Sequence, residues 1–272
     1  MKNVITFCTN ETYIHYSDAL VHSILKSGTN CDIVIRAVNC ATDKINHFNT
    51  ERVAVIEDNM PLNTVKKYIK NRDDDILSDY GVSIYTNHNI DRISGILYSE
   101  EMAYTCHSRF KTILELHNSY DKVLALDADT VVIKNIDCLF DSIDNYDIGT
   151  ILTKAYTGDT IYYERGRRVV ADIDTFAFFD EGIFISNNTE KSISYLTQIV
   201  SDIEHEFIDW DCDSRILYKR RSGDMKILSL DAKFKDKTFS NDSYMWSGDC
   251  VGKYNTIFND KCDENININI NK

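Results

Sequence analysis

Two aspartates separated by one alanine are the residues of this sequence best suited to chemistry. Asp127 and Asp129 directly follow the apolar run 123–126, which is typical of a strand buried in the middle of a sheet. Residues i and i+2 of an extended chain point to the same side, so we expect the two carboxylates to lie together at the end of that strand. Like charges in an apolar setting need a cation or a shared proton. The pair therefore predicts a site for a hard divalent cation, which can also bind diphosphate oxygens.

A turn is the structural alternative, with one aspartate capping the short helix expected at Ile136. The apolar run 130–133 follows the pair at once, so the aspartates lie inside a continuous hydrophobic pattern. Capping explains that placement poorly, and we favour the functional interpretation.

The elements around the pair predict an α/β protein. An apolar strand at 4–8, a helix from Tyr16 that ends at 27–30 and a second strand at 32–38 form the pattern of a right-handed βαβ unit with a parallel sheet. A third short strand is expected at 52–56. Further along the chain we expect helices at 101–118, 136–140 and 191–207, and strands at 123–126, 131–133 and 182–185.

The length of 272 residues predicts one catalytic domain over 1–262. Residues 58–100 lose clear periodicity and are predicted to be a surface excursion. The tail 263–272 alternates asparagine and isoleucine and is predicted to be a low-complexity end.

Composition excludes several classes of function. A net charge of -13 opposes binding to duplex nucleic acid. No apolar run is long enough to cross a membrane, and the short run 4–8 is not a signal-peptide core. The eight cysteines show no C-x-x-C spacing, so neither a zinc ribbon nor a redox pair is indicated. The missing signal peptide favours reduced thiols and a cytoplasmic location.

The segment 111–140 resembles the core signature of the family 8 glycosyltransferases, the glycogenin and lipopolysaccharide galactosyltransferase group. It has a helix with a lysine, then Tyr-x-Lys-Val, the Asp-Ala-Asp pair and Lys-Asn-Ile-Asp-x-Leu-Phe. Residues 9–13 resemble the family's first strand and loop. Residues 179–185 resemble the segment of the family that contacts the donor sugar. The resemblance implies a GT-A fold, with a mainly parallel central sheet flanked by helices. It also implies retaining transfer from a nucleotide diphosphate sugar, with Mn²⁺ or Mg²⁺ as cofactor and UDP as the nucleotide.

The resemblance also implies roles for individual residues. Asp127 would contact the ribose and the metal, and Asp129 would be the main metal ligand. The donor-binding residues it implies are Thr9, Asn10, Tyr13, Lys111, Asp127, Ala128 and Lys253. The carboxylates expected around the sugar are Asp180, Glu181, Asp211 and Asp213. The acceptor would be a glycan, a lipid-linked molecule or a protein.

Two departures from the family pattern concern the metal and the acceptor side. Ser247 stands where a ligating histidine is expected, and Asp249 is the predicted substitute, since a carboxylate suits a hard cation. Ser214 replaces a glutamine that usually follows an aspartate near the acceptor.

Two other functions remain open at this point. A haloacid-dehalogenase-type phosphatase would use Asp127 as nucleophile and Asp129 as general acid. The motif of such phosphatases normally stands near the N-terminus. They also require a late Gly-Asp-x-x-x-Asp sequence, and here Lys253 occupies the position of its second aspartate after Gly248-Asp249. A degenerate transferase fold that binds nucleotide sugar without turnover is the other alternative.

Overall fold

The computed structural model describes residues 2–45, 48, 50–60, 100–154, 161–164, 167–170, 177–205, 217, 220, 223–248 and 255–267. The helices are η1 (Glu11–Tyr13), α1 (Ile14–Lys26), α2 (Thr42–Ile45), α7 (Glu100–Leu116), α8 (Asp137–Ser142), α9 (Glu190–His205), η5 (Ala232–Phe234) and α11 (Thr256–Asn267). The strands are β1 (Asn3–Thr9), β2 (Asp32–Val38), β3 (Val53–Asp58), β4 (Lys122–Leu126), β5 (Thr130–Val132), β6 (Ile148–Lys154), β7 (Ile161–Glu164), β8 (Arg167–Val170), β9 (Ala177–Asn187), β10 (Ile227–Ser229) and β11 (Met245–Ser247).

A seven-stranded sheet in the order β10-β6-β9-β4-β1-β2-β3 forms the centre of the fold. The neighbours β1 and β2, β1 and β4, β2 and β3, and β10 and β6 are parallel. Strand β9 runs antiparallel between β4 and β6. The predicted α/β class with a mainly parallel sheet is therefore confirmed.

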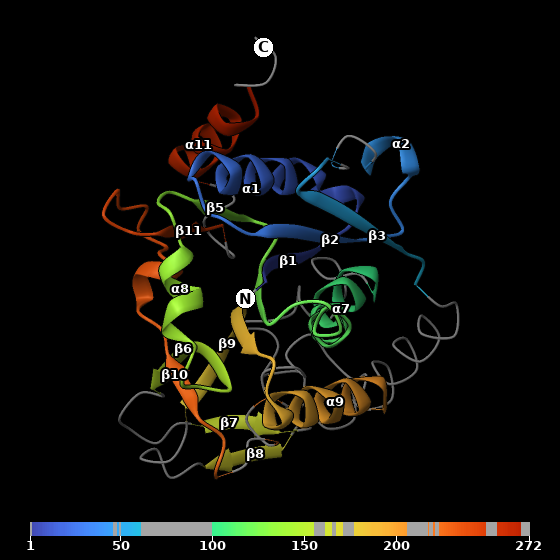
Figure 1. The fold of residues 1–272 in the computed structure, drawn as a ribbon, viewed down its shortest axis with the longest axis vertical. Helices are drawn as coiled ribbons and strands as arrows, with labels where there is room; N and C mark the ends of the chain where they lie inside the picture. The colour runs from blue at the N-terminus through green and yellow to red at the C-terminus, as the bar shows by residue number, and fades with distance from the viewer. Residues whose placement is uncertain are drawn as a thin grey trace.

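Helices cover both faces of this sheet (Figure 1). Alternate residues of the central strands pack to opposite sides, and both sides are apolar because neither meets water. On one face Ile5, Ile35 and Leu124 pack with residues of α1 and α8. On the other face Val4 and Val123 pack with residues of α7 and α9.

The strands predicted at 123–126 and 131–133 correspond to β4 and β5, but the aspartate pair between them lacks the extended geometry that was expected. Strand β4 ends at Leu126, residues 128–129 form a turn, and β5 then pairs antiparallel with β11 in a separate small sheet. The chain leaves the central sheet here because β5 takes its hydrogen-bonding partner from β11 rather than from β9. The aspartates therefore lie in a turn at the carboxyl end of β4.

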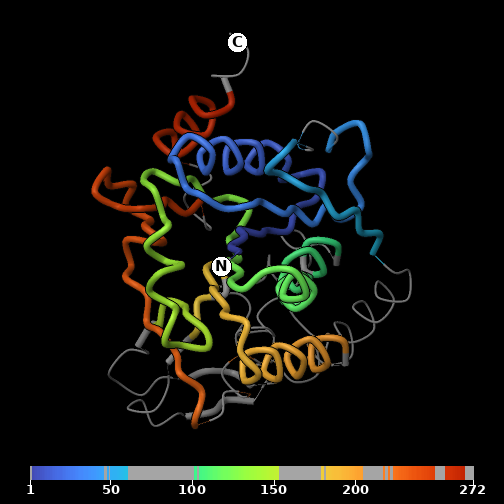
Figure 2. Tube along the Cα trace, viewed as in Figure 1, coloured from blue at the N-terminus to red at the C-terminus, as the bar shows by residue number. Residues whose placement is uncertain are grey.

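The predicted tail is wrong as far as residue 267, because helix α11 extends to Asn267. Phe258, Cys262 and Ile266 recur every four residues and pack with Ala19 of α1. This i, i+4 spacing of one helix face is hidden by the alternation of asparagine and isoleucine. Figure 2 shows the C-terminal helix lying beside α1.

No helix in the described part of the chain is long and apolar enough to span a membrane. Strand β3 continues to Asp58, and most of the predicted surface excursion lies outside the described residues.

Candidate active site

Four charged side chains of alternating sign meet at the carboxyl end of β4. Arg109 Nη2 lies 2.8 Å from Asp127 Oδ1, and Lys235 Nζ lies 3.5 Å from Asp127 Oδ2 and 2.6 Å from Asp180 Oδ1. The side chains of the two cations are 6% and 9% exposed, whereas those of Asp127 and Asp180 are 23% and 21% exposed. A ligand can therefore reach the carboxylates, and the cations support them from within.

Strand β9 brings Asp180 beside Asp127. The Asp127 amide donates to the Gly182 carbonyl at 3.0 Å, and the Gly182 amide donates to Asp180 Oδ1 at the same distance. A Cβ atom at position 182 would lie 2.1 Å from both Asp127 Oδ2 and Lys235 Nζ. Glycine is thus needed at this position so that the carboxylate and the ammonium can approach the backbone of β9.

The second aspartate of the pair is held by the C-terminal part of the chain. Asp129 is buried, and its carbonyl accepts a hydrogen bond from the Gly248 amide at 2.7 Å. A Cβ atom at position 248 would lie 2.7 Å from the ring of Phe258 and 2.9 Å from the Asp129 carbonyl oxygen. Helix α11 therefore lies directly against the turn that carries Asp129.

The loop after β1 lies at the same edge of the sheet. Thr9 and Asn10 are buried, and Ser17 donates to the Thr9 hydroxyl at 2.7 Å. The Asn10 amide donates to Glu101 at 3.1 Å and accepts from Thr12 at 2.8 Å, so its orientation is defined from both sides. The ring of the neighbouring Tyr13 lies 5.8 Å from that of Tyr16, centroid to centroid.

Helix α7 presents Arg109 to the carboxylates, whereas the predicted donor ligand Lys111 is exposed. Residues two positions apart on a helix point about 200° apart. Since Phe110 and Ile113 face the core, the helical period of the sequence would have placed Arg109, rather than Lys111, near the sheet. No local pattern in the sequence marks Lys235, which reaches the site from a loop more than a hundred residues later.

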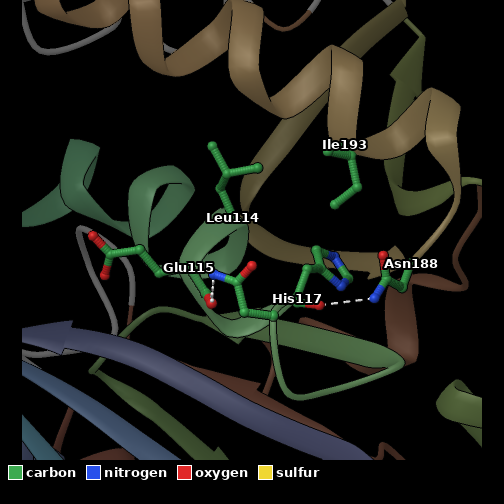
Figure 3. A pocket seen from close by; sticks show the side chains of 6 residues that line it. Leu114, Glu115, His117, Asn188 and Ile193 are labelled. Carbon is green, nitrogen blue, oxygen red and sulfur yellow. Dashed lines mark hydrogen bonds between the residues drawn. The ribbon is translucent and has the colours of Figure 1, made fainter.

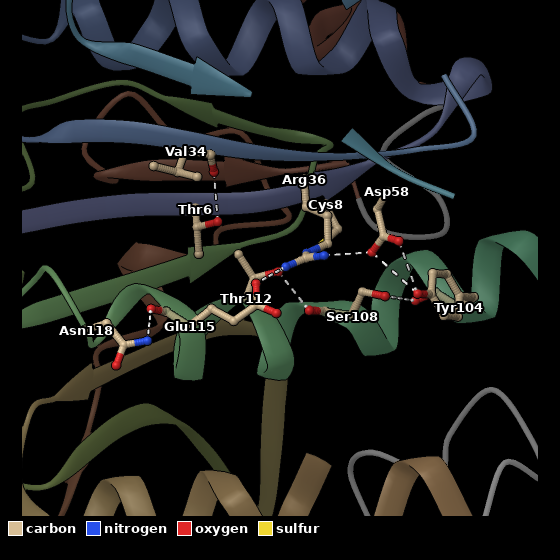
Figure 4. Close-up of polar contacts among 10 residues, drawn as sticks. All are labelled: Thr6, Cys8, Val34, Arg36, Asp58, Tyr104, Ser108, Thr112, Glu115 and Asn118. Atoms are coloured by element: carbon tan, nitrogen blue, oxygen red, sulfur yellow. Dashed lines mark hydrogen bonds and ion pairs between the residues drawn. The ribbon is translucent and has the colours of Figure 1, made fainter. Parts of the chain in front are cut away.

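An ion-pair network centred on the buried Arg36 fixes α7 to the sheet (Figure 4). From β2, Arg36 donates to Thr112 of α7 at 2.6 Å and to Asp58 of β3 at 2.7 Å. It also pairs with Glu115 of α7. This network sets the position of the helix that carries Arg109. The nearby Cys8 thiol has its pKa raised to about 11 by burial, against the opposing effect of the two arginines.

Other predicted site residues are only partly described. Ala128 is buried in the turn, and Ser247 is buried at the end of β11. Glu181 belongs to β9, but its side chain lies outside the described part. Asp211, Asp213, Asp249 and Lys253 also lie outside the described residues.

The chemistry of the carboxylates fits a hard divalent cation. Mg²⁺ and similar ions are commonly held by one or two carboxylates, with substrate phosphates and waters completing the shell. Asp127 and Asp129 offer carboxylates of this kind. Within the described residues no group of three or more histidine, cysteine or acidic side chains comes together.

A cavity of about 370 Å³ lies at the opposite edge of the sheet, between the end of α7 and the start of α9 (Figure 3). His117 lines it, with Nε2 2.9 Å from the Ser186 hydroxyl. Burial lowers the pKa of His117, although its contact with the Tyr120 carbonyl acts in the other direction. The Asn118 and Asn188 amides at its rim donate to backbone carbonyls. This cavity is separate from the charged cluster.

The fold is one that solved structures of a class of enzymes share, the GT-A glycosyltransferases. The apo bifunctional glycosyltransferase WbbM matches with a TM-score of 0.57 and 16% identity over 98% of this chain and 49% of that chain. The galactosyltransferase LgtC, in complex with donor and acceptor sugar analogs, matches with a TM-score of 0.53 and 13% identity over 97% of this chain and 96% of that chain. GlyE of Streptococcus pneumoniae TIGR4 matches with a TM-score of 0.57 and 11% identity over 98% of this chain and 62% of that chain.

The family model of glycosyl transferase family 8 matches residues 4–210. The chain therefore belongs to glycosyl transferase family 8, as its sequence predicts. It spans about half the length of WbbM. No curated protein matches the sequence.

Proposed function

We propose that this chain transfers a sugar from a uridine diphosphate donor to an acceptor hydroxyl, with retention of anomeric configuration. The observation that supports this most directly is the pair of reachable carboxylates, Asp127 and Asp180, which two buried cations hold at the carboxyl end of β4. Ligands of open α/β sheets bind at that edge. In a member of family 8, a nucleotide sugar is the ligand that such an edge would take.

The donor would lie across the ends of β1 and β4. Thr9, Asn10 and Tyr13 would hold the nucleoside, in keeping with the defined orientation of the Asn10 amide. Ala128 would lie beneath the donor as part of the turn, and Lys253 would contact the diphosphate. From α7 we propose Arg109 as the residue that acts at the donor site, in place of the exposed Lys111.

Asp127 and Asp129 would hold a divalent cation, Mn²⁺ or Mg²⁺, with Asp249 as a third ligand. A bound cation would stabilise the charge that develops on the departing diphosphate. Arg109 would keep Asp127 in position through its bond to Oδ1, leaving the other face of the carboxylate for the cation and the ribose.

Acidic side chains would orient the sugar hydroxyls and support positive charge at the anomeric carbon. Asp180 is the described member of this group, and the others proposed are Glu181, Asp211 and Asp213. The acceptor would be a glycan, a lipid-linked molecule or a protein. The predicted cytoplasmic location belongs to the same proposal.

Release of nucleoside diphosphate from a panel of nucleotide sugars, with Mn²⁺ and with a chelator, tests the function. We expect release only with the metal. A phosphatase would release inorganic phosphate, and a binding protein would bind a donor without releasing either product. Calorimetry with and without chelator measures donor binding separately from turnover, and equal affinity in both conditions would contradict the metal role.

Replacing the proposed main metal ligand gives the sharper test. Asp129→Asn keeps size and removes an anionic oxygen, so turnover should fall by roughly a hundredfold or more. The exposed Asp141 of α8 provides a matched control, since Asp141→Asn should leave turnover unchanged. If Asp129→Asn lowered only the melting temperature and kept full turnover per folded molecule, Asp129 would be structural and the proposal wrong.

A further inference from the structure

We propose that Lys235 is a place-holding cation, which neutralises Asp127 in the absence of donor. When metal and donor bind together, the Lys235 ammonium moves away from Asp127 Oδ2, and the divalent cation binds that oxygen instead. The inference rests on the proposed function, because it requires Asp127 to be a metal ligand. It assigns to Lys235 a task that the sequence did not suggest: to make metal binding depend on the donor.

The distances from Lys235 to its two carboxylates are unequal. Its Nζ lies 2.6 Å from Asp180 Oδ1, within the range of a strong charged hydrogen bond, and 3.5 Å from Asp127 Oδ2, beyond that range. The contact with Asp127 is therefore mainly electrostatic. The ammonium can give up Asp127 and remain bound to Asp180.

The two oxygens of Asp127 are held differently. Arg109 donates to Oδ1 at 2.8 Å, a normal hydrogen-bond length, and the Arg109 side chain is buried. Oδ2 is the atom that faces Lys235 and lies over Gly182. An incoming cation would thus take Oδ2 with the least rearrangement.

The backbone beneath Lys235 is held rigidly, so its ammonium end alone needs to move. The Lys235 amide donates to the Ala232 carbonyl at 3.0 Å, and the preceding Phe234 ring stacks on Tyr244. The next residue, Asp236, accepts from the backbone and side chain of Thr238, the backbone of Ser240 and the side chain of Ser243. Partial burial acts to raise the pKa of Asp236, but these hydrogen bonds outweigh it and lower that pKa.

Charge explains why this arrangement couples metal to donor. An ammonium and a divalent cation at the same carboxylate repel each other strongly in a partly buried site. The diphosphate of the donor adds negative charge beside the cation and offsets that repulsion. A lysine that weakens metal binding to the free protein, and no longer does so once donor is bound, increases the factor by which donor strengthens metal binding.

Titration of Mn²⁺, followed by the electron paramagnetic resonance signal of the free ion, tests this with and without UDP. Lys235→Met keeps the length of the side chain and removes its charge. We expect Lys235→Met to bind Mn²⁺ about tenfold more tightly than wild type without UDP, and to show a smaller gain in affinity on addition of UDP. Lys235→Arg keeps the charge and should resemble wild type. Lys233→Met, an exposed lysine two residues away, is the matched control and should change neither affinity.

The outcomes separate this inference from the proposed function. If wild type binds Mn²⁺ and Lys235→Met binds it equally or more weakly, the place-holding role is wrong, while the metal-dependent transferase stands. If neither protein binds Mn²⁺ with or without UDP, both are wrong. If circular dichroism shows that Lys235→Met does not fold, the same two titrations are carried out on Lys235→Gln, with the same expected results.

Discussion

At the scale of single residues, the site depends on charges held at specific distances. Arg109 and Lys235 each contact one oxygen of Asp127. Gly182 lets the Asp127 carboxylate and the Lys235 ammonium approach β9. Each contact joins residues from separate elements: α7, the turn after β4, β9 and the loop after η5. The geometry of the carboxylates is therefore sensitive to a change as small as one methyl group.

Gly182→Ala should reduce turnover much more than it reduces stability. The added Cβ would fall 2.1 Å from Asp127 Oδ2 and Lys235 Nζ, which are the ends of flexible side chains and can move aside. We expect roughly a hundredfold loss of kcat/KM, since displacement of a positioned group by about 1 Å has that effect, with a small change in melting temperature. Gly223→Ala meets nothing within 4 Å and is the control. Wild-type turnover in Gly182→Ala would contradict a role for this cluster in the reaction.

At the scale of elements, the two edges of the sheet have different chemistry. The carboxyl ends of β1 and β4 carry Thr9 and the aspartates, whereas the region before β4 contains the buried His117, which contacts Ser186 of β9. Helix α7 connects the two edges. It has Arg109 in its middle, and its last turn is followed by His117.

His117 should make stability depend on pH. Because burial lowers its pKa in the folded protein, the unfolded chain takes up the proton first as pH falls below about 6.5. The contribution is fully present above that pH and is lost below it, with a slope of at most about 1.4 kcal/mol per pH unit for one proton. Urea denaturation between pH 7.5 and 5.5 measures this slope. His117→Gln should flatten it, whereas His15→Gln, at an exposed position, should not. An unchanged slope in His117→Gln would exclude His117 as the source.

At the scale of the whole molecule, elements from the first and the last part of the sequence lie at the candidate site. Strand β1 supplies the first loop, and α11 packs on α1 and against the turn of Asp129 through Phe258 and Gly248. The C-terminal helix therefore supports the proposed metal site, although it lies far from it in sequence.

Two truncations measure that support. A chain that ends at Cys262 loses the buried Asn265 and the partly buried Ile266, so its melting temperature should fall by roughly 3–6 °C. A chain that ends at Asn267 keeps all of the described helix and should melt within about 1 °C of the full chain. Equal melting of the two truncated proteins would show that the last turns of α11 contribute nothing to stability.

The sequence by itself determined the class of fold and pointed to a candidate site. Buried parallel strands are continuous apolar runs, so the strands at 4–8 and 32–38 and the strand before Asp127 could be predicted locally. The aspartate pair could be found because two charges after an apolar run have few structural explanations. The helical period of α7 also indicates that Arg109 faces the sheet. The family resemblance instead pointed to Lys111 as the donor-binding residue of this helix.

Tertiary structure alone decided which charges meet. The antiparallel placement of β9 puts Asp180 and Gly182 beside Asp127, and a loop beyond η5 brings Lys235 between the two carboxylates. The turn at 128–129 exists because β5 pairs with β11 instead of continuing in the central sheet. Such pairings join segments that are far apart in the sequence, and the free energy that selects them comes from the packed core as a whole. The local spacing of residues therefore does not predict which segments pair.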